Sequence, residues 1–592
     1  MAPSVSLFLS LLAASQLAFS GTVSALKAVS LDFHVRRIEP SSSSMGKRDT
    51  TAAGLTRRQL GYYASLAVGT PPQNFVVHLD TGSSDTWIPA VDSSLCQSSP
   101  AACQLSGRYD VGNSSTANGL RQIFQTSFGD GSKHNGTFIT DTVAFADAVL
   151  PDMHLALVKQ SANVPLGDLD TYAAGRLGLG FEETEAGVVF SNVTAYPNIV
   201  SELVANGYIE TKAYSLWLNS AASLNGSILF GAVDSTKYKG SLMAIPTVPS
   251  PNPKEPARQA VQMTSLTLNT NNGASALVAS GSVLYAHLDT GSTTTFLPRA
   301  MAEAIHSAAG VLNNNATSNR PYVSCNMSTA AATFTFGFGG PLGPQISVSM
   351  ADFVHPFANN ITFGDGTPAC YFDLESSDYP FAVLGDSFLR SAYAVFDLEN
   401  RQIALAQSNI DVNSNSSSNS TLLSSTTNNN TSSSSSISIS PITRGRNGIP
   451  GLERILPALP YPQAYVDQYN QNISRLATYV PAAISPLTAT ANIRVSDLPP
   501  TASFTAEGPA NLGTAGTALA TPTAAARGNG SAPGVGVPTP LFPGPTGEAG
   551  AQNGTVPSSS SHGVMDTRIT TGVLCLGFTL GAAAMVIEVF SP

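Results

Sequence analysis

The sequence predicts an all-β, two-lobed fold with a functional site in a cleft between the lobes, followed by a disordered stalk. The first observation is a repeat, because residues 78–83 read HLDTGS and residues 287–292 read the same. The second is that short aromatic and β-branched runs, separated by Gly, Pro and Asn turns, extend from about residue 60 to residue 408. The third is a change to Ser, Asn and Thr after residue 408, which is too polar to build a core.

The repeat is longer than the shared string. Residues 80–89 read DTGSSDTWIP and residues 289–298 read DTGSTTTFLP, with an aromatic at Trp87 and at Phe296. A single Asp-Thr-Gly recurs by chance, whereas a repeat of this length indicates two related lobes. Each lobe then offers one carboxylate, Asp80 or Asp289, to a shared site.

Length and composition limit what the chain can be. Its 592 residues suffice for several domains, but only 11% are charged, and 50 Gly and 39 Pro accompany the polar tracts. We therefore expect only part of the chain to form a compact core. The net charge of −10 argues against a nucleic-acid-binding protein, which would carry a basic patch.

The N-terminus has the pattern of a secretory signal peptide. Residues 5–17 form an apolar run too short to span a membrane, and small-residue cleavage patterns end at Ser20 and again at Ala25. We assign residues 1–20 to the signal peptide, with cleavage after residue 25 as the alternative site. The alternative is a buried N-terminal helix.

Residues 21–58 are interpreted as a propeptide. The segment is basic and contains the dibasic pairs Lys47-Arg48 and Arg57-Arg58, which secretory processing proteases cut. Such a segment can occupy an acidic cleft until low pH protonates the carboxylates. The alternative is a disordered spacer. The two lobes then comprise residues 59–250 and 251–408, with the boundary in the Pro/Asn-rich stretch 246–256 and a brief helical pattern at 300–309.

Residues 409–560 are interpreted as a low-complexity stalk, in which scattered apolar residues between 441 and 500 allow a short helix. Residues 569–587 carry no charged side chain, and small residues and a polar spacer precede them. This order predicts a GPI-anchor signal at 561–592, with a transmembrane helix as the alternative. Sequons for surface glycosylation occur at Asn113, Asn135, Asn192, Asn225, Asn315, Asn326, Asn360, Asn419, Asn430, Asn472, Asn529 and Asn553.

Secretion permits disulfide bonds. Cys96 and Cys103 lie in one polar loop, and Cys325 and Cys370 lie in the second lobe. The simplest pairing is local, with one bridge per lobe, although the sequence leaves other pairings open. Cys575 is left over in the C-terminal apolar run.

The repeated loop suits acid–base chemistry. Gly82 and Gly291 allow a tight turn, so that backbone N–H groups and a Ser hydroxyl can donate to the preceding carboxylate. Two carboxylates brought together cannot both ionise and share one proton. One is then a general base for a bound water, and the other is a general acid for a carbonyl oxygen. This route hydrolyses an amide with no metal, no cofactor and no covalent intermediate.

Residues 61–408 resemble a pepsin-family aspartic protease. The resemblance rests on HLDTGSSDTWIP at 78–89, FGDGS at 128–132, the second HLDTGS, AVLGDSFL at 382–389 and AVFD at 394–397. The propeptide, stalk and tail resemble the fungal yapsin-type subgroup. The resemblance implies the pepsin-like bilobal fold, with loops 175–179 and 383–385 packed behind the catalytic loops. It also implies roles for the repeated residues: Asp80 and Asp289 catalytic, Ser83 and Ser292 bonded to their outer oxygens, and Thr81 and Thr290 interlocking the lobes.

The family closes its cleft with a β-hairpin flap, which matches residues 122–130 and 131–143. Phe128 stands where the flap usually has a Tyr bonded to the indole of Trp87, so we expect activity at reduced efficiency and another acceptor, or water, at the indole. Gly129 and Asp130 follow at the tip. Asp130 is either a turn residue or a counter-ion for a Lys or Arg in the substrate's P1 position.

Arg176 is a second departure, because the family usually has an apolar residue on this loop of the S1 pocket. Either its stem packs while its head reaches solvent, or it places a positive charge near S1. The second interpretation opposes a basic P1 residue unless Arg176 pairs with an acid. His78 and His287 are expected in strand packing, with titration near neutrality that loosens the lobes as the alternative.

The sequence therefore predicts a secreted aspartic endopeptidase, active at acid pH on peptide or protein substrates. We expect a monomer, held at the cell membrane or wall by a lipid anchor, with no nucleic-acid partner. The main alternative is a binding or wall protein that kept the fold and lost catalysis, against which both intact DTGS copies argue. A third interpretation, a glycosylated adhesin, is supported by the stalk alone.

Overall fold

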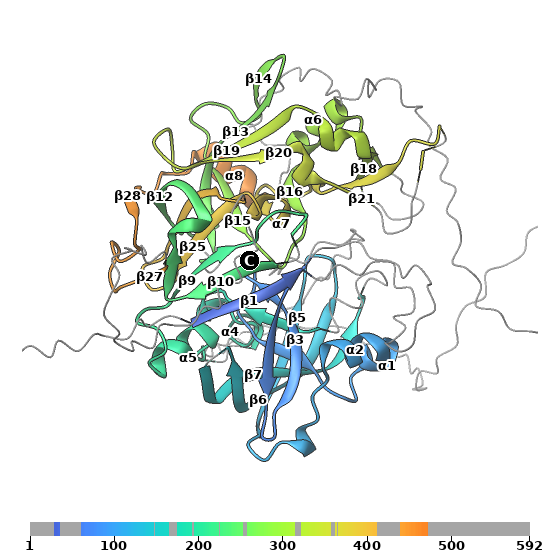
Figure 1. Cartoon of the computed structure of the whole chain (residues 1–592), viewed down its shortest axis with the longest axis vertical. Helices are drawn as coiled ribbons and strands as arrows, with labels where there is room; N and C mark the ends of the chain where they lie inside the picture. The colour runs from blue at the N-terminus through green and yellow to red at the C-terminus, as the bar shows by residue number, and fades with distance from the viewer. Residues whose placement is uncertain are drawn as a thin grey trace, which may run out of the picture. The chain divides into compact units, whose positions relative to one another are not determined.

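The computed structural model describes residues 29–35, 61–410 and 439–471, with gaps inside the central range. The gaps are 147, 165–173, 192–193, 224, 253–256, 314–320, 357–361 and 364. All described residues belong to one compact unit, in which strands predominate as predicted (Figure 1). The signal peptide, most of the propeptide and the predicted anchor tail lie outside the described residues.

The N-terminal lobe is one half of a 14-stranded sheet. Short runs of aromatic and β-branched residues after Gly and Pro turns form its strands, as at the turn after Val68, where Gly69 has φ 95°. In sheet order these strands are β2 (Tyr62–Val68), β3 (Gln73–Asp80), β8 (Arg176–Gly178), β4 (Trp87–Pro89), β7 (Ala148–Ala162), β6 (Lys133–Phe145) and β5 (Asn118–Ser127).

The other half of this sheet connects the two predicted lobes. Strands from the last part of the second lobe pair with strands from the first, for example β25 with β9. The predicted division at residue 250 is therefore incomplete, because residues 392–408 join the shared sheet. In order, this half contains β28 (Leu452–Ile455), β12 (Tyr238–Pro246), β26 (Gln402–Ser408), β25 (Ala392–Asp397), β9 (Ala213–Trp217), β10 (Asn225–Phe230) and β1 (Val29–Val35).

Strand β1 lies within the predicted propeptide. It pairs antiparallel with β10 and with β2. The alternative of a disordered spacer is therefore wrong for residues 29–35, which are part of the sheet.

The C-terminal lobe is built on an eight-stranded sheet and a small four-stranded sheet. The larger sheet contains β20 (Gln345–Ser349), β19 (Ala332–Phe338), β13 (Ala260–Thr270), β15 (Leu284–Leu288), β24 (Ala382–Leu384), β16 (Thr295–Pro298) and β23 (Leu374–Ser377), with β14 (Gly273–Ala276) beside β13. The smaller sheet contains β17 (Leu312–Asn313), β18 (Pro321–Ser324), β22 (Ala369–Phe372) and β21 (Val354–Pro356).

The helices are short and lie between strands. The longest, α6 (Arg299–Ala309), agrees with the predicted pattern at 300–309 and ends at Gly310 in the left-handed conformation, with φ 63°. The other α-helices in the described ranges are α1 (Ser94–Ser98), α2 (Pro100–Ser106), α4 (Ala186–Ser191), α5 (Ile199–Ala205), α7 (Asp386–Leu389) and α8 (Gln463–Asn470). Apolar side chains of both lobes form one continuous core cluster.

Residues 439–471, predicted as part of the stalk, pack on the protein body, and this prediction is therefore wrong for them. The strand β27 (Ile439–Pro441) pairs with β11 (Ala232–Asp234), and β28 pairs in parallel with β12. The predicted short helix is α8, which Figure 1 shows in orange beside β15. We name residues 439–471 the C-terminal strap.

The hydroxyl of Tyr465 joins the strap to the C-terminal lobe. It donates to the carbonyl oxygen of Pro380 at 2.9 Å and accepts from the backbone N–H of Tyr285 at 3.0 Å. The side-chain amide of Gln262 exchanges two further hydrogen bonds with the backbone of Leu459, at 2.6 and 2.7 Å.

The structure confirms the local disulfide pairing. Cys96 bonds to Cys103 and Cys325 bonds to Cys370, one bridge in each lobe. Cys575 lies outside the described residues. Within the described ranges, no helix is both long and apolar enough to cross a membrane.

Candidate active site

The two repeated aspartates emerge from equivalent buried strands. β3 ends at Asp80, and β15 ends at Leu288, one residue before Asp289. Each strand pairs in parallel with a short strand from further along the chain, β3 with β8 and β15 with β24. As predicted, residues 175–179 and 383–385 thus support the two loops from behind, and both carboxylates are buried, with 3% and 1% of their residues' surface exposed.

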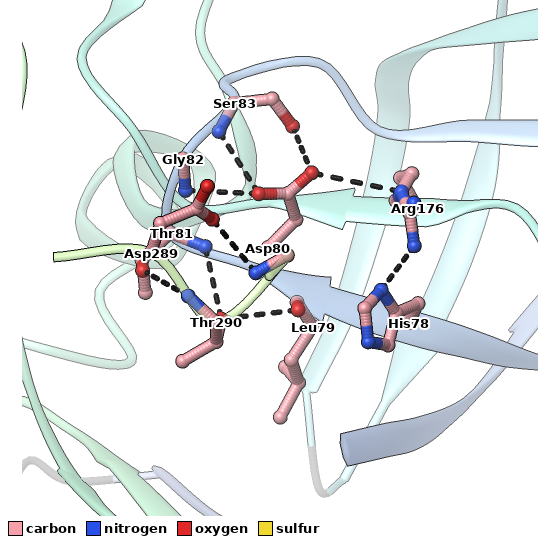
Figure 2. Close-up of polar contacts among 10 residues, drawn as sticks. His78, Leu79, Asp80, Thr81, Gly82, Ser83, Arg176, Asp289 and Thr290 are labelled. Atoms are coloured by element: carbon pink, nitrogen blue, oxygen red, sulfur yellow. Dashed lines mark hydrogen bonds and ion pairs between the residues drawn. The ribbon is translucent and has the colours of Figure 1, made fainter. Parts of the chain in front are cut away.

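Thr81 and Thr290 interlock the two loops, as the resemblance implied. The Thr81 hydroxyl donates to the Leu288 carbonyl at 2.9 Å and accepts from the Thr290 N–H at 3.0 Å. The Thr290 hydroxyl likewise donates to the Leu79 carbonyl at 3.0 Å and accepts from the Thr81 N–H at 3.1 Å. Figure 2 shows the contacts among Thr81, Thr290 and Leu79, and the whole exchange ties the ends of β3 and β15 to the opposite lobe.

The glycines of the two loops leave room for the opposite carboxylates. A Cβ atom on Gly82 would overlap the carboxylate of Asp289, and one on Gly291 would overlap that of Asp80. Only a residue without a side chain fits at either position. The carboxylates of Asp80 and Asp289 therefore adjoin one another across the lobes.

The hydrogen bonds to the two carboxylates differ. Asp80 accepts from the N–H groups of Gly82 and Ser83 at 2.9 and 3.1 Å, and from the Ser83 hydroxyl at 2.7 Å. Asp289 accepts from the Gly291 N–H at 2.8 Å.

Ser292 does not take the expected position. Its hydroxyl donates to the carbonyl oxygen of Thr294 at 2.8 Å, two residues along its own loop. The prediction that Ser292 hydrogen-bonds the outer oxygen of Asp289 is therefore wrong, because a hydroxyl has one proton to donate. The corresponding prediction for Ser83 and Asp80 is confirmed.

Burial and the neighbouring carboxylate act together on Asp289. Burial disfavours its charged form, and the carboxylate of Asp80 adds like-charge repulsion, so that the pKa of Asp289 lies well above its ordinary value. Asp80 has the larger set of hydrogen-bond donors. The arrangement therefore suits a pair in which Asp289 carries the shared proton.

Arg176 lies beside Asp80 and is fully buried. Its Nε is 3.7 Å from Oδ2 of Asp80, its guanidinium contacts Nδ1 of His78, and its Cζ is 5.4 Å from the centre of the Phe128 ring (Figure 2 shows the first two contacts). The interpretation that the head of Arg176 reaches solvent is wrong. A positive charge near S1 would oppose a basic P1 residue bound by Asp130 unless Arg176 paired with an acid. Asp80 is that acid.

The two histidines that precede the aspartates are buried in the strands, as expected. Burial and the Arg176 charge hold the pKa of His78 well below its usual range, and burial with the Arg258 charge lowers the pKa of His287 to about 3. Both are neutral near pH 7, so the alternative that their titration there loosens the lobes is wrong.

The flap is a hairpin of β5 and β6. At its tip the N–H of Ser132 donates to Oδ1 of Asp130 at 2.8 Å, and Gly131 has φ 84°, which gives Asp130 the turn role. Phe128 is buried.

The indole of Trp87 lacks the acceptor that a flap tyrosine would provide. Its Nε1 is buried and has no hydrogen-bond partner among the described residues. Instead the His134 ring stacks on Trp87, with 5.0 Å between ring centres. His134 was not predicted from the sequence, and no local motif marks it, because it reaches the site through the pairing of β6.

A second group of buried acids, also missed, lies behind the flap in the N-terminal lobe. The Tyr196 hydroxyl donates to Asp85 at 2.5 Å, and the Tyr196 N–H donates to Glu185 at 3.0 Å. Burial raises the pKa of Asp85 to about 6 and that of Glu185 to about 10. The His154 ring stacks on Tyr196, 4.0 Å between centres. Asp85 is the sixth residue of the DTGSSD string, where the second copy has Thr294, so the repeat gave no sign of this role.

The paired carboxylates, the interlocked threonines and the hairpin agree with a comparison to known families. Residues 61–408 match the family described as Eukaryotic aspartyl protease. The chain belongs to this family. As an aspartyl protease it is a hydrolase of the aspartic endopeptidase type. Among the described residues, no group of His, Cys, Asp and Glu side chains could hold a metal ion.

Several curated relatives of the protease come from fungi. The protein named "Probable aspartic-type endopeptidase OPSB" of Arthroderma benhamiae is 31% identical over 413 residues, which cover 69% of this chain and 80% of the relative. The protein of the same name in Aspergillus oryzae is 34% identical, covering 62% and 72%. Candidapepsin-3 of Candida albicans is also 34% identical, covering 62% of this chain and 85% of the relative.

Proposed function

We propose that the protease is a secreted, cell-surface endopeptidase that hydrolyses peptide bonds at acid pH with Asp80 and Asp289 as its catalytic pair. The observation that carries the proposal is the close approach of the two carboxylates, each accommodated by the glycine of the opposite loop. Two acids in such contact retain one proton between them over a range of pH.

The asymmetry of the pair suggests which acid does what. Asp80, with three hydrogen-bond donors, is the carboxylate that takes a proton from a bound water. Asp289, whose pKa burial and Asp80 raise, gives its proton to the carbonyl oxygen of the peptide. The water oxygen bonds to the carbonyl carbon as these protons move. On collapse of the tetrahedral diol, Asp80 gives its proton to the amide nitrogen, a hydroxyl of the diol returns a proton to Asp289, and the C–N bond breaks to release the amine and the carboxylic acid.

Activity at acid pH follows from the same pair of carboxylates. The hydrolysis needs one proton on the two carboxylates, and raising the pH removes it. Peptide or protein substrates are implied by the family, and an extended chain is the form that a hairpin flap can cover.

The catalytic assignment is tested with purified full-length protein and a quenched peptide library between pH 3 and pH 7. Asp80→Asn and Asp289→Asn are each expected to lower kcat/KM by about 10³-fold or more, and pepstatin to block the unmodified protein. Asp378→Asn, which removes a carboxylate that pairs with Arg299 at the surface, is the matched control and keeps its activity. Absence of pepstatin-sensitive cleavage in the unmodified protein would instead favour a binding or wall protein.

The location is tested separately. The signal-like N-terminus, the polar tract and the uncharged run at 569–587 support secretion and a GPI anchor. Phosphatidylinositol-specific phospholipase is expected to release the protein from cells, and retention after treatment would count for a transmembrane helix. N-terminal sequencing of the mature protein is expected to begin at Gln59, and a start well before Asp49 would contradict the propeptide assignment.

A further inference from the structure

Arg176 brings a buried positive charge to one side of the catalytic pair. It lies on β8, whose parallel pairing with β3 sets Arg176 opposite His78 and Gly178 opposite Asp80. From this register the guanidinium reaches the outer oxygen Oδ2 of Asp80, the same oxygen that accepts from Ser83 (Figure 2). The side chains of Arg176 and Asp80 are 1% and 4% exposed, so that bulk water screens their attraction little.

Two aromatic neighbours hold the guanidinium in this place. A guanidinium can only donate, so His78 accepts through Nδ1 and carries its own proton on Nε2. The guanidinium also lies over the ring of Phe128, the residue that follows flap strand β5. The lobe thus orients Arg176 toward Asp80 from the strand behind and from the flap.

Titratable groups on neighbouring elements interact with Arg176 or with the two catalytic aspartates. Asp289 adjoins Asp80 from the C-terminal lobe, and Asp386 of the same lobe interacts with Asp289. Tyr214 on β9 interacts with Asp80. His78 on β3 and His134 on β6 also sense Arg176, and both are neutral because burial and that charge lower their pKa values. Arg176 is therefore the cation that these groups place against Asp80.

We propose that Arg176 is a positioning residue of the catalytic pair, which keeps Asp80 as the carboxylate and leaves the shared proton on Asp289. This inference rests on the proposed two-aspartate mechanism. Arg176 contacts Asp80 on the side away from Asp289, so its attraction acts more strongly on the nearer carboxylate. Asp80 is thereby kept in the form that accepts a proton from water.

The proposal has a consequence for the pH range of activity. A nearby cation stabilises each ionised state of the pair, so both protons leave at lower pH than they otherwise would. Removal of the cation raises the pH at which the first proton leaves and the pH at which the second leaves. Both limbs of the profile of kcat/KM against pH then move upward.

The test compares pH profiles of full-length Arg176→Met, Arg176→Gln and Arg176→Lys with the unmodified protein. The Met and Gln variants are expected to move the acid limb upward by about 1 pH unit or more, whereas Lys, which keeps the charge, moves it less than half as far. Arg299→Met removes a partly exposed arginine that pairs with Asp378 and is the matched control, with both limbs in place. A purely structural role for Arg176 would lower kcat/KM at every pH without moving the limbs, and that result would overturn the proposal.

A stability measurement covers the case in which the Met and Gln variants do not fold. Asp80→Asn removes the carboxylate that faces the buried guanidinium, whereas Asp289→Asn leaves that pair intact and replaces the neighbouring acid that carries the shared proton. The Tm of Asp80→Asn at pH 5 is therefore expected to be the lower of the two, and equal values would contradict the inference.

The outcomes separate the two proposals. If the unmodified protein shows no pepstatin-sensitive cleavage, or if Asp289→Asn stays fully active, the two-aspartate function itself is wrong. If the unmodified protein cleaves and only the limbs of the Arg176 variants fail to move, the role of Arg176 alone is wrong.

Discussion

Buried acids and buried histidines contribute to the stability of this protease with opposite dependences on pH. Asp85 and Glu185 have raised pKa values, so the folded state holds their protons more tightly than the unfolded chain does. Their stabilisation is complete below their ordinary pKa values near 4 and is lost as the pH rises toward about 6 and about 10. His134 and His287, with pKa values lowered to about 3, contribute stability above pH 6.5 that is lost as the pH falls toward 3.

Replacing Glu185 with Gln tests the first of these effects. Gln cannot ionise, so the variant avoids the proton uptake that the wild-type chain needs to fold at neutral pH. The free energy of unfolding is expected to rise by on the order of 3 kcal/mol at pH 7 relative to wild type, with little difference at pH 4. Denaturant titrations at the two pH values measure this, and an equal change at both would contradict a protonated Glu185.

Phe128 offers a second test at the scale of one atom. Phe128→Tyr supplies a hydroxyl where the family places one, within the surroundings of the buried Trp87 Nε1, which has no partner among the described residues. The variant is expected to gain about 1 kcal/mol in the free energy of unfolding and several-fold in kcat/KM.

The matched control for that change is Phe124→Tyr, because Phe124 is buried edge-on against Phe138. It adds the same hydroxyl to an apolar site and is expected to lower stability. A gain in stability in Phe124→Tyr, or no gain in Phe128→Tyr, would indicate that a hydroxyl at position 128 does not provide the acceptor for the Trp87 indole.

At the scale of elements, the ends of β3 and β15 are held together by the threonine exchange. Thr81→Val keeps the side-chain shape and removes the hydroxyl, which leaves the Thr290 N–H and the Leu288 carbonyl buried without partners. We expect a loss of about 2–4 kcal/mol in the free energy of unfolding and a lower kcat, because the two carboxylates lose their common support.

Thr86→Val is the control for the threonine exchange. The Thr86 hydroxyl is also buried but has no hydrogen-bond partner among the described residues, so this variant is expected to be neutral or stabilising. Unfolding by urea with activity measured in parallel compares the two, and similar stability of Thr81→Val and Thr86→Val would argue against the interlock.

For the whole molecule, the C-terminal strap extends the folded body past the matched family region. It adds strands to β12 and β11 and buries Ile442, Ile449 and Leu456. A chain ending at residue 410 is expected to lose on the order of 5 kcal/mol of stability relative to a chain ending at residue 471.

Thermal unfolding of the two truncated chains and the full chain measures the contribution of the strap. The chain that ends at residue 471 is expected to retain the Tm of the full-length protein. Equal Tm values for the two truncated chains would show that the strap adds nothing to the stability of the body.

The sequence by itself determined the all-β class, the two related lobes, the aspartate pair, the flap hairpin and the preference for local disulfides. These follow from patterns that neighbouring residues carry, such as the repeated loop, the turn residues and the short β-branched runs. The strap escaped prediction because its strands dock through backbone hydrogen bonds to sheet edges, which any sequence can make. Its buried residues Ile442 and Ile449 each stand singly among polar, Gly and Pro residues, so no periodic pattern marks them.

Only the tertiary structure decided what surrounds the pair. The contact of Arg176 with Asp80 depends on the parallel register of β8 with β3, which joins residues far apart in the chain. The hydroxyl of Ser292 turned to Thr294, although the same motif in the other lobe directs Ser83 to Asp80. Identical strings therefore acquire different hydrogen bonds, because a side chain with one proton responds to the acceptors that the fold places nearest to it.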